Sequence, residues 1–286
     1  MKLHVGGVPE HFNLPWHWAW ENQHLAELPI AFDWKSYPNG TGAMCQDLRS
    51  GDLDIAVILS EGILQDIQQG NPSKVVALYV NSPLRWGVHA PANSNLSDEE
   101  LLRTGRYAIS RRKSGSHLMA HVHADAGQRI LDEDKDFVLV ENLEGARKSF
   151  AAGESELFLW ERFTTKHLVD SGEFKHIGDC YTPWPSFVIA VREEVLAERE
   201  AEIHALIYYI QELAGQLAKR ADIIQILSVK YGLKPEDAEA WFSKLEWNTG
   251  EWLPKDTLVK MLSDMKHFQL LPDKAKAEDY LAIGTH

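Results

Sequence analysis

The sequence predicts an α/β protein built from two lobes of similar design. Short apolar runs alternate with segments of helical spacing, and the runs Asp52–Leu59 and Lys74–Val80 have the composition of buried parallel strands. This order implies a parallel sheet with right-handed crossovers. A similar turn precedes two of the predicted strands, at Gly51-Asp52-Leu53-Asp54 and at Gly153-Glu154-Ser155-Glu156-Leu157. Such an internal similarity is expected of two related lobes.

Composition limits the classes of partner. The 286 residues suffice for one large domain or two medium ones. The chain has 29 Lys and Arg against 42 Asp and Glu, and its net charge of −13 argues against nucleic acid or an anionic membrane as partner. Cys45 and Cys180 are the only cysteines, so neither a disulfide framework nor a zinc signature is present and two buried thiols are expected. No run reaches the roughly 18 apolar residues of a membrane span.

The N-terminal residues bear on localisation. Met1-Lys2 runs directly into a predicted strand, without the apolar segment and cleavage site of a secretory signal. If Met1 is the native start, we expect a cytoplasmic protein. If a signal peptide was removed, we expect a periplasmic or lipid-anchored one.

The first elements are a strand at Leu3–Val8 and a Trp-rich helix. Trp16, Ala19 and Trp20 share a face of this helix, so at least one Trp is expected in the core. The next strand is predicted at Ile30–Trp34.

Two turns then carry polar groups. Thr41 is predicted to cap a helix that contains Met44 and Leu48 and ends at Gly51. The turn Ser60-Glu61-Gly62 opens the next helix. Both turns expose helix N-termini on the same side of the sheet, where negative charge is favoured.

The middle of the chain is predicted to form the second lobe. Residues 81–89 begin as a loop and resume as a strand, which suits a crossing between lobes, and Ser97 is a good helix cap. A strand at Tyr107–Ser110 leads into the turn Ser114-Gly115-Ser116, which suits an anion or a carbonyl oxygen.

The helix after that turn carries two histidines at metal-pair spacing. His117 and His121 are four residues apart. There is no Glu between them and no evident third ligand. We therefore predict no metal and no cofactor, with one histidine turned toward the ligand.

The last part of the chain returns to the first lobe. A strand is predicted at Glu156–Trp160, and the return crossing at Cys180–Phe187 has two prolines around Trp184, as expected of a stiff hinge with an aromatic wall. A strand at Val188–Val191 follows. From Glu194 onward, apolar residues at helical spacing predict helices that pack on the first lobe.

The Gly-Thr-Gly-Ala-Met turn, the Gly-x-Leu-Asp-x-Ala strand and the following Ser-Glu-Gly closely resemble the type 2 periplasmic-binding-protein fold. Within that fold the chain is most similar to the NMT1/THI5-like and sulfonate/nitrate-binding receptors of ABC transporters, over all but about the last forty residues. The resemblance implies a first lobe of residues 1–82 plus 184–286 and a second of residues 83–183, closing on one small molecule. It also implies a monomer, with an ABC transporter membrane component as partner if the protein is exported.

The resemblance also implies which residues meet the ligand. They lie in the turns that follow strands and in the crossings between lobes: His11, Phe12, Asn13, Thr41, Gly42, Glu61, Ser82, Ser114, Ser116, His117, Trp160, Glu161 and Trp184. For three of these residues a purely structural role is an alternative to contact with the ligand. Asn13 suits a helix cap equally well, Trp160 suits the core, and Glu161 can pair with Arg162.

Two ligand classes and one enzymatic alternative stay open. The two glutamates and two histidines suit an amine-bearing heteroaromatic such as a thiamin-precursor pyrimidine, whereas the hydroxyl turns suit a sulfonate or carboxylate. Thiamin pyrimidine synthases also resemble this chain, but their cysteine cluster is missing here. A thiol nucleophile at Cys45, close to a helix N-terminus, is the remaining enzymatic option, without an assignable base. We expect a binding protein rather than an enzyme.

Overall fold

The computed structural model describes residues 2–22, 30–112, 114–250 and 252–282. These residues divide into two compact units. Unit 1 comprises Met1–Ser82 and Trp184–His286, and unit 2 comprises Pro83–Pro183. No helix in the described ranges combines the length and the apolar character needed to cross a membrane.

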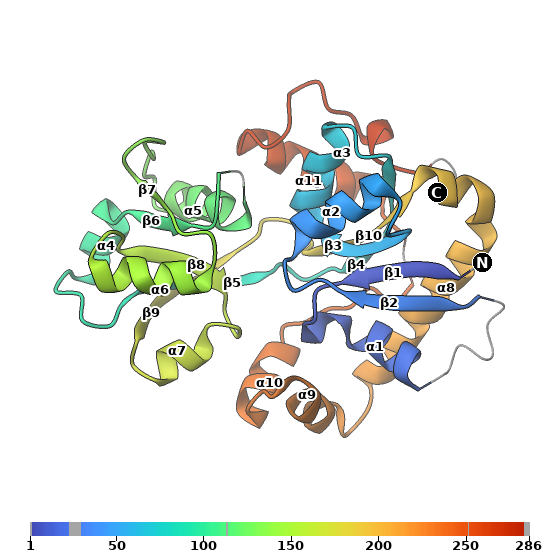
Figure 1. Cartoon of the computed structure of the whole chain (residues 1–286), viewed down its shortest axis with the longest axis horizontal. Helices are drawn as coiled ribbons and strands as arrows, with labels where there is room; N and C mark the ends of the chain where they lie inside the picture. Colours follow the sequence, from blue (N-terminus) through green and yellow to red (C-terminus); the bar gives the residue numbers. More distant parts are fainter. Residues whose placement is uncertain (1, 23–29, 113, 251, 283–286) are drawn as a thin grey trace. The chain divides into compact units, whose positions relative to one another are not determined.

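Unit 1 is built on a five-stranded sheet of order β2-β1-β3-β10-β4 (Figure 1). Its strands are β1 (Leu3–Gly7), β2 (Phe32–Ser36), β3 (Ile55–Leu59), β4 (Ser73–Val80) and β10 (Phe187–Arg192). β1 pairs in parallel with β2 and β3, as predicted. β10, however, runs antiparallel to both of its neighbours, so the sheet is mixed.

Helices surround this sheet and continue into the C-terminal section. They are α1 (Leu14–Glu21), α2 (Thr41–Ser50), α3 (Ser60–Gln68), α8 (Glu193–Ala218), α9 (Ile223–Tyr231), α10 (Pro235–Phe242) and α11 (Lys255–His267), with 3-10 turns η1 (His11–Asn13) and η3 (Ala277–Asp279). α8 packs against α1, β4 and β10. The last described residues return to the sheet, where the Val75 N–H donates to the Tyr280 carbonyl at 2.8 Å.

Unit 2 repeats the strand order of unit 1. Its sheet has the order β7-β6-β8-β5-β9, from β5 (Arg85–Pro91), β6 (Tyr107–Ile109), β7 (Phe137–Leu139), β8 (Leu157–Glu161) and β9 (Phe174–Tyr181). β5 is the antiparallel strand here, as β10 is in unit 1. The helices are α4 (Asp98–Thr104), α5 (Gly115–Ala126), α6 (Leu143–Ala152) and α7 (Lys166–Asp170). Gly51 and Gly153, whose turns looked alike in the sequence, each end a helix in left-handed conformation and lead into β3 and β8.

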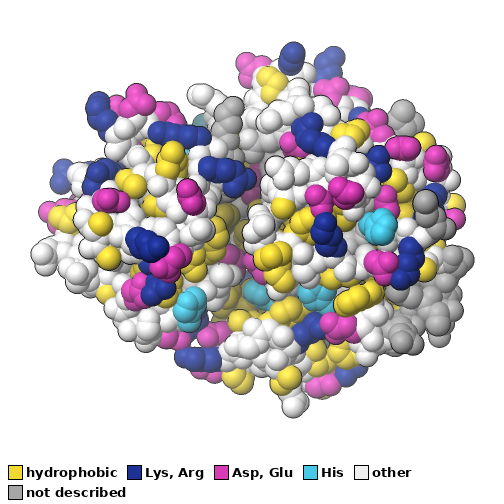
Figure 2. All heavy atoms as spheres, in the orientation of Figure 1, with side chains coloured by type: hydrophobic (Ala, Val, Ile, Leu, Met, Phe, Trp, Pro, Cys, Tyr) yellow, Lys and Arg dark blue, Asp and Glu magenta, His cyan; other side chains and the backbone are white. Residues whose placement is uncertain are grey.

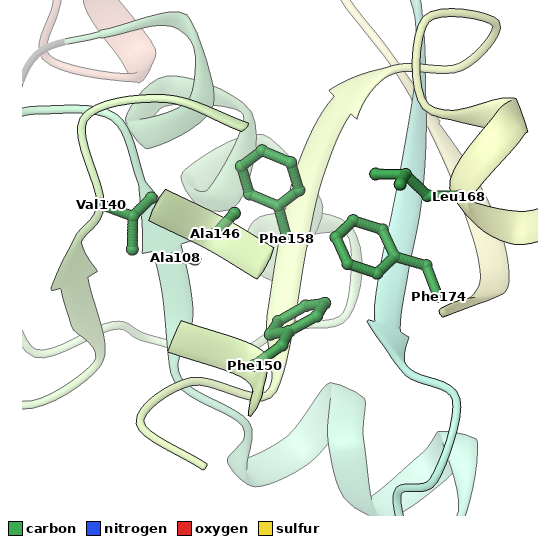
Figure 3. Packing of buried hydrophobic residues seen from close by; sticks show 7 residues of the cluster. All are labelled: Ala108, Val140, Ala146, Phe150, Phe158, Leu168 and Phe174. Carbon is green, nitrogen blue, oxygen red and sulfur yellow. The ribbon is translucent and has the colours of Figure 1, made fainter. Parts of the chain in front are cut away.

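An aromatic cluster fills one part of unit 2 (Figure 3). It joins side chains of β6, β8, β9, α6, α7 and the loop after β7: Ala108, Val140, Ala146, Phe150, Phe158, Leu168 and Phe174. Phe158 and Phe174 lie edge to face, with ring centroids 6.4 Å apart. Trp160 packs against the rim of this cluster and is partly buried.

Several predicted boundaries were wrong. β2 begins two residues later than predicted, and Cys180 lies within β9, a strand that the prolines and polar residues around it concealed. Trp16 is buried as expected, but Trp20 is 44% exposed. Gly40, not Thr41, is the residue before α2, and its φ of 69° is one that glycine adopts readily.

Candidate functional site

The loops predicted to meet the ligand in unit 1 gather at one edge of its sheet. In the register, Gly7 at the end of β1 is opposite both Ser36 at the end of β2 and Val57 in β3. Because β10 is antiparallel, its first residue, Phe187, pairs with Leu59 at the end of β3. The segments that hold His11–Asn13, Thr41, Glu61 and Trp184 therefore leave or enter the sheet along this edge.

The loop after β1 is anchored through a backbone carbonyl. The oxygen of Phe12 accepts hydrogen bonds from the Tyr79 hydroxyl at 2.8 Å and from the Trp247 indole at 2.9 Å. The Phe12 ring lies 4.9 Å from the ring of Phe187, between centroids. His11 is buried beside Trp241, and burial lowers the pKa of its imidazole to about 3. His11 is therefore a neutral side chain at physiological pH.

Asn13 does not cap α1. Its side-chain amide donates to the Val8 carbonyl at 2.8 Å, and no side-chain bond to the helix N-terminus is present. Its Oδ1 is buried and, among the described residues, has no hydrogen-bond partner. Asn13 thus occupies the N-cap position of α1 without capping the helix through its side chain, and a polar acceptor remains at the sheet edge.

The two predicted turns of unit 1 are in direct contact. A Cβ placed on Gly62 would lie only 2.2 Å from Cγ2 of Thr41, so α3 begins against the first residue of α2. With Thr41 in this rotamer, the close approach leaves no room for a side chain at position 62. Thr41 and Gly42 lie in the first turn of α2, where backbone N–H groups favour an anion or an acceptor.

Glu61 and Trp184 form a buried pair at this edge. The Trp184 indole N–H donates to Oε2 of Glu61 at 3.0 Å. The other carboxylate oxygen, Oε1, is buried and has no hydrogen-bond partner in the described part of the chain. Burial raises the pKa of Glu61, and the hydrogen bonds from its own backbone N–H and from the Trp184 indole only partly oppose this. The Oε1 atom can therefore accept a hydrogen bond from a ligand when the carboxyl is ionised and can donate one when it is protonated.

The serines of unit 2 form a closed network. The Ser114 hydroxyl caps α5 by accepting from the His117 N–H at 3.3 Å. The Ser116 hydroxyl accepts from the Ser110 N–H at 2.9 Å and lies 3.1 Å from the hydroxyl of Ser114. The turn is therefore held in shape by its own hydroxyls, and replacing Ser116 would disturb the fold.

Trp86 is a candidate that the sequence did not reveal. It lies in β5, and its ring packs 3.2 Å from the position a Cβ on Gly115 would take, at the start of α5. Trp160 lies near it, with ring centroids 6.4 Å apart, and stacks on Phe158. The Trp86 Nε1 is buried without a hydrogen-bond partner among the described residues. Trp86 and Gly115 lie in different elements, so no local sequence pattern relates them.

The other predicted residues have structural partners. The Glu161 carboxylate accepts from the backbone N–H groups of Phe163 and Thr164, so it closes a turn, and burial raises its pKa. The Ser82 hydroxyl accepts from the Glu246 N–H at 3.1 Å. Cys45 is 7% exposed and occupies the second turn of α2, because that helix begins at Thr41.

A third side chain with a possible ligand atom accompanies the histidine pair, although the sequence indicated none. His117, His121 and Glu133 offer ligand atoms that all lie within 4.8 Å of one another. Glu133 belongs to the loop between α5 and β7 and is twelve residues from His121, too far along the chain for the helical spacing to indicate it.

The charges on the visible surface do not form a field of one sign. In Figure 2, acidic and basic side chains alternate over the described parts of this face. Nothing on this face suggests electrostatic steering of a polyanion, in agreement with the net charge of −13.

Several known proteins are similar to this chain in fold. The family of Ca3427-like PBP matches residues 86–180. The Candida albicans CA3427 gene product is 28% identical, with a TM-score of 0.88 over 99% of this chain and 96% of that one. No curated protein sequence matches the chain.

Two bacterial structures are similar at lower identity. The alkanesulfonate-binding protein SsuA from Xanthomonas axonopodis pv. citri, bound to MOPS, is 15% identical with a TM-score of 0.78, over 98% of both chains. The ligand-binding component of an ABC-type import system from Staphylococcus aureus, with zinc bound, is 13% identical with a TM-score of 0.75, over 99% of this chain and 96% of that one. Two mixed sheets with the same strand order, and matches over nearly the whole length of these structures, identify the chain as a protein of the periplasmic-binding-protein fold.

Proposed function

We propose that this protein is a solute-binding protein that takes one small molecule at the strand-end edge of unit 1. The observation that carries the proposal is the Glu61–Trp184 pair. It places a carboxylate oxygen without a partner among the described residues beside two helix N-termini. Buried polar groups are normally satisfied, so an unsatisfied one in a native protein calls for a functional explanation.

The chemistry of this edge favours a ligand with a hydrogen-bond donor and an apolar ring. Glu61 offers an acceptor, and Phe12, Trp184 and Phe187 are buried aromatic residues of the same edge. An amine-bearing heteroaromatic such as an aminopyrimidine can bond to the carboxylate, and it can stack on these rings once they open to it. This supports the heteroaromatic class over a simple anion.

A small sulfonate is the second candidate. The likeness to an alkanesulfonate-binding protein supports it, as do the first-turn N–H groups of α2 and α3. For a sulfonate to bind beside Glu61, that carboxyl would have to be protonated, because two unscreened negative charges repel. The raised pKa of Glu61 makes this cost smaller than at an ordinary glutamate.

A thermal-shift screen tests the proposal. The panel contains an aminopyrimidine thiamin precursor, aliphatic sulfonates and nitrate, and each compound is also assayed for consumption. At one hundred times its Kd, a ligand stabilises the folded state by about 2.7 kcal/mol, which is readily measured. Binding without turnover supports a solute receptor, whereas consumption of a compound would favour an enzyme.

Two further points remain proposals. Closure of the two lobes on the ligand rests on the resemblance to this fold, and small-angle scattering with and without ligand tests it by a decrease in the radius of gyration. A partnership with an ABC transporter depends on export. It is supported by the S. aureus protein, which is the ligand-binding component of such a system.

A further inference from the structure

The side chains of His117, His121 and Glu133 lie close enough together to form a metal site. The Nε2 atoms of His117 and His121 lie 3.3 Å apart. Nε2 of His121 is 3.0 Å from Oε1 of Glu133, and Nε2 of His117 is 3.3 Å from Oε2. Tetrahedral zinc with bonds of about 2.0–2.1 Å places neighbouring ligand atoms about 3.3–3.4 Å apart. Two of these separations, His117–His121 and His121–Oε1, approach the edges of such a tetrahedron, while the 3.3 Å contact of His117 is to the other carboxylate oxygen. One ligand atom from each of the three residues lies within 4.8 Å of the other two.

The imidazole rings are held so that their Nε2 atoms converge. They lie one turn apart on α5, and the Phe137 ring packs against both, with centroids 4.6 Å from His117 and 5.3 Å from His121. Fixed ring orientation lowers the entropy that ligands lose when a metal binds. One side of this cluster is open to solvent, because 34% of the His121 side chain and 53% of the Glu133 side chain are exposed.

The loop that carries Glu133 is braced on both sides. The Asp132 N–H donates to Oδ2 of Asp136 at 2.7 Å, and the Asp136 N–H donates back to the Asp132 carbonyl at 2.9 Å. Arg129 fixes the same turn by donating to Oδ1 of Asp136 at 2.8 Å. Glu133 is therefore presented by a closed turn rather than by a free loop.

Arg112 has a supporting role in this arrangement. Its guanidinium donates to Oε2 and to the backbone carbonyl of Glu133, which leaves Oε1 directed at His121. Carboxylates that bind metals are commonly hydrogen-bonded in this way by an outer partner. The positive charge of Arg112 also opposes a cation, so a moderate rather than an extreme affinity is expected.

We propose that His117, His121 and Glu133 form a binding site for one divalent transition-metal ion of the Zn²⁺ type. Two imidazoles and one carboxylate are ligands that zinc accepts, and a fourth position stays open for water or another donor. Calcium and magnesium, which prefer sites made of oxygen ligands, are excluded by the two ring nitrogens. The site is independent of the solute proposed for unit 1, since no residue of that edge contributes to it.

Zinc titration tests the proposal. The purified full chain is stripped with a chelator and titrated with ZnCl₂ by calorimetry, beside His121→Gln, Glu133→Gln and the control His167→Gln. We expect one Zn²⁺ per chain for the parent and the control. Removing a residue that only hydrogen-bonds to a metal ligand lowers metal affinity roughly 10–100-fold. Each site variant removes a ligand itself, so its affinity for Zn²⁺ should fall by more than this. Both site residues are partly exposed, so the variants should fold, which circular dichroism verifies.

Cobalt provides a second measurement. Co²⁺ in a site with nitrogen and oxygen ligands of low symmetry absorbs visible light more strongly than the hydrated ion, so a parent-specific spectrum that both site variants lose would confirm the site. Zinc binding that is unchanged in His121→Gln and Glu133→Gln would overturn the proposal. So would the absence of stoichiometric binding by the parent, which would leave the cluster as a hydrogen-bonded ion pair.

Discussion

At the scale of single residues, Glu61 is the side chain in which stability and the proposed function conflict. A carboxylate is costly to bury unless all of its lone pairs are bonded, and only one of its oxygens meets the Trp184 indole. The sequence correctly placed Glu61 in the turn that opens α3, and its contact with a ligand stays a prediction. Its partner Trp184 lies 123 residues away along the chain, so no local pattern could have connected the two.

Replacing Glu61 by Gln should stabilise the ligand-free protein at neutral pH. Burial raises the pKa of Glu61 in the folded state. Above the ordinary pKa of a glutamate, folding must therefore either keep the carboxyl group protonated or bury its negative charge. The free energy of unfolding falls as the pH rises from the ordinary pKa to the raised one. Glutamine removes that cost, which amounts to about 1.4 kcal/mol for each unit of pKa difference, and its amide oxygen can still accept from Trp184. Calorimetric melting of the parent and of Glu61→Gln at pH 5, 7 and 8 measures this gain in stability.

The gain from Glu61→Gln should shrink at pH 5, where the parent carboxyl is more nearly protonated. Glu200→Gln, at an exposed position on α8, is the control and should leave melting unchanged at each pH. A lower melting temperature for Glu61→Gln at pH 8 would show that the carboxylate is well solvated or paired.

At the scale of elements, the junction of α2 and α3 depends on the absence of a side chain at Gly62. Gly62→Ala would bring a Cβ within 2.2 Å of the Thr41 methyl, so either the Thr41 side chain must rotate or one helix must move. We expect destabilisation of about 1–3 kcal/mol, the usual cost of overpacking, measured by urea unfolding. Gly215→Ala in α8 is the matched control, because its Cβ meets nothing nearer than 3.5 Å and alanine favours a helix. Equal effects of both substitutions would refute the close junction.

The elements also show where sequence reasoning succeeds and where it stops. Apolar runs and glycine caps predicted β3, α2 and the similar turns at Gly51 and Gly153, because these signals are local. The antiparallel pairing of β10 depends on which strands lie beside it, and β9 is polar enough to resemble a loop. Glu133 reaches His121 only through the folded path of its loop, so the sequence did not indicate it as a partner of the histidine pair.

At the scale of the whole molecule, buried neutral histidines should make the fold sensitive to acid. Burial lowers the pKa of His17 to about 4 and that of His89 to about 4, as it lowers that of His11 to about 3. Between these values and about 6.5, the unfolded chain binds protons that the folded chain does not, so stability falls as pH decreases. Each such histidine contributes up to about 1.4 kcal/mol per pH unit.

His89→Gln isolates one of these contributions. We expect the melting temperature of this variant to fall less between pH 7 and pH 5 than that of the parent, even if the variant is less stable at pH 7. His167→Gln, at an exposed position, should keep the parental slope. A parental slope in His89→Gln would mean that this imidazole is already protonated in the fold.

The central claim is that one small molecule binds at the edge of unit 1 where Glu61 lies, and isothermal titration of an aminopyrimidine into the parent and into Glu61→Gln tests it most directly. We predict one site per chain in the parent. In the variant the affinity should fall by the roughly 1.5–3 kcal/mol that a hydrogen bond to a charged group contributes. Unchanged affinity in Glu61→Gln, or no binding of any compound in the panel by the parent, would contradict the account.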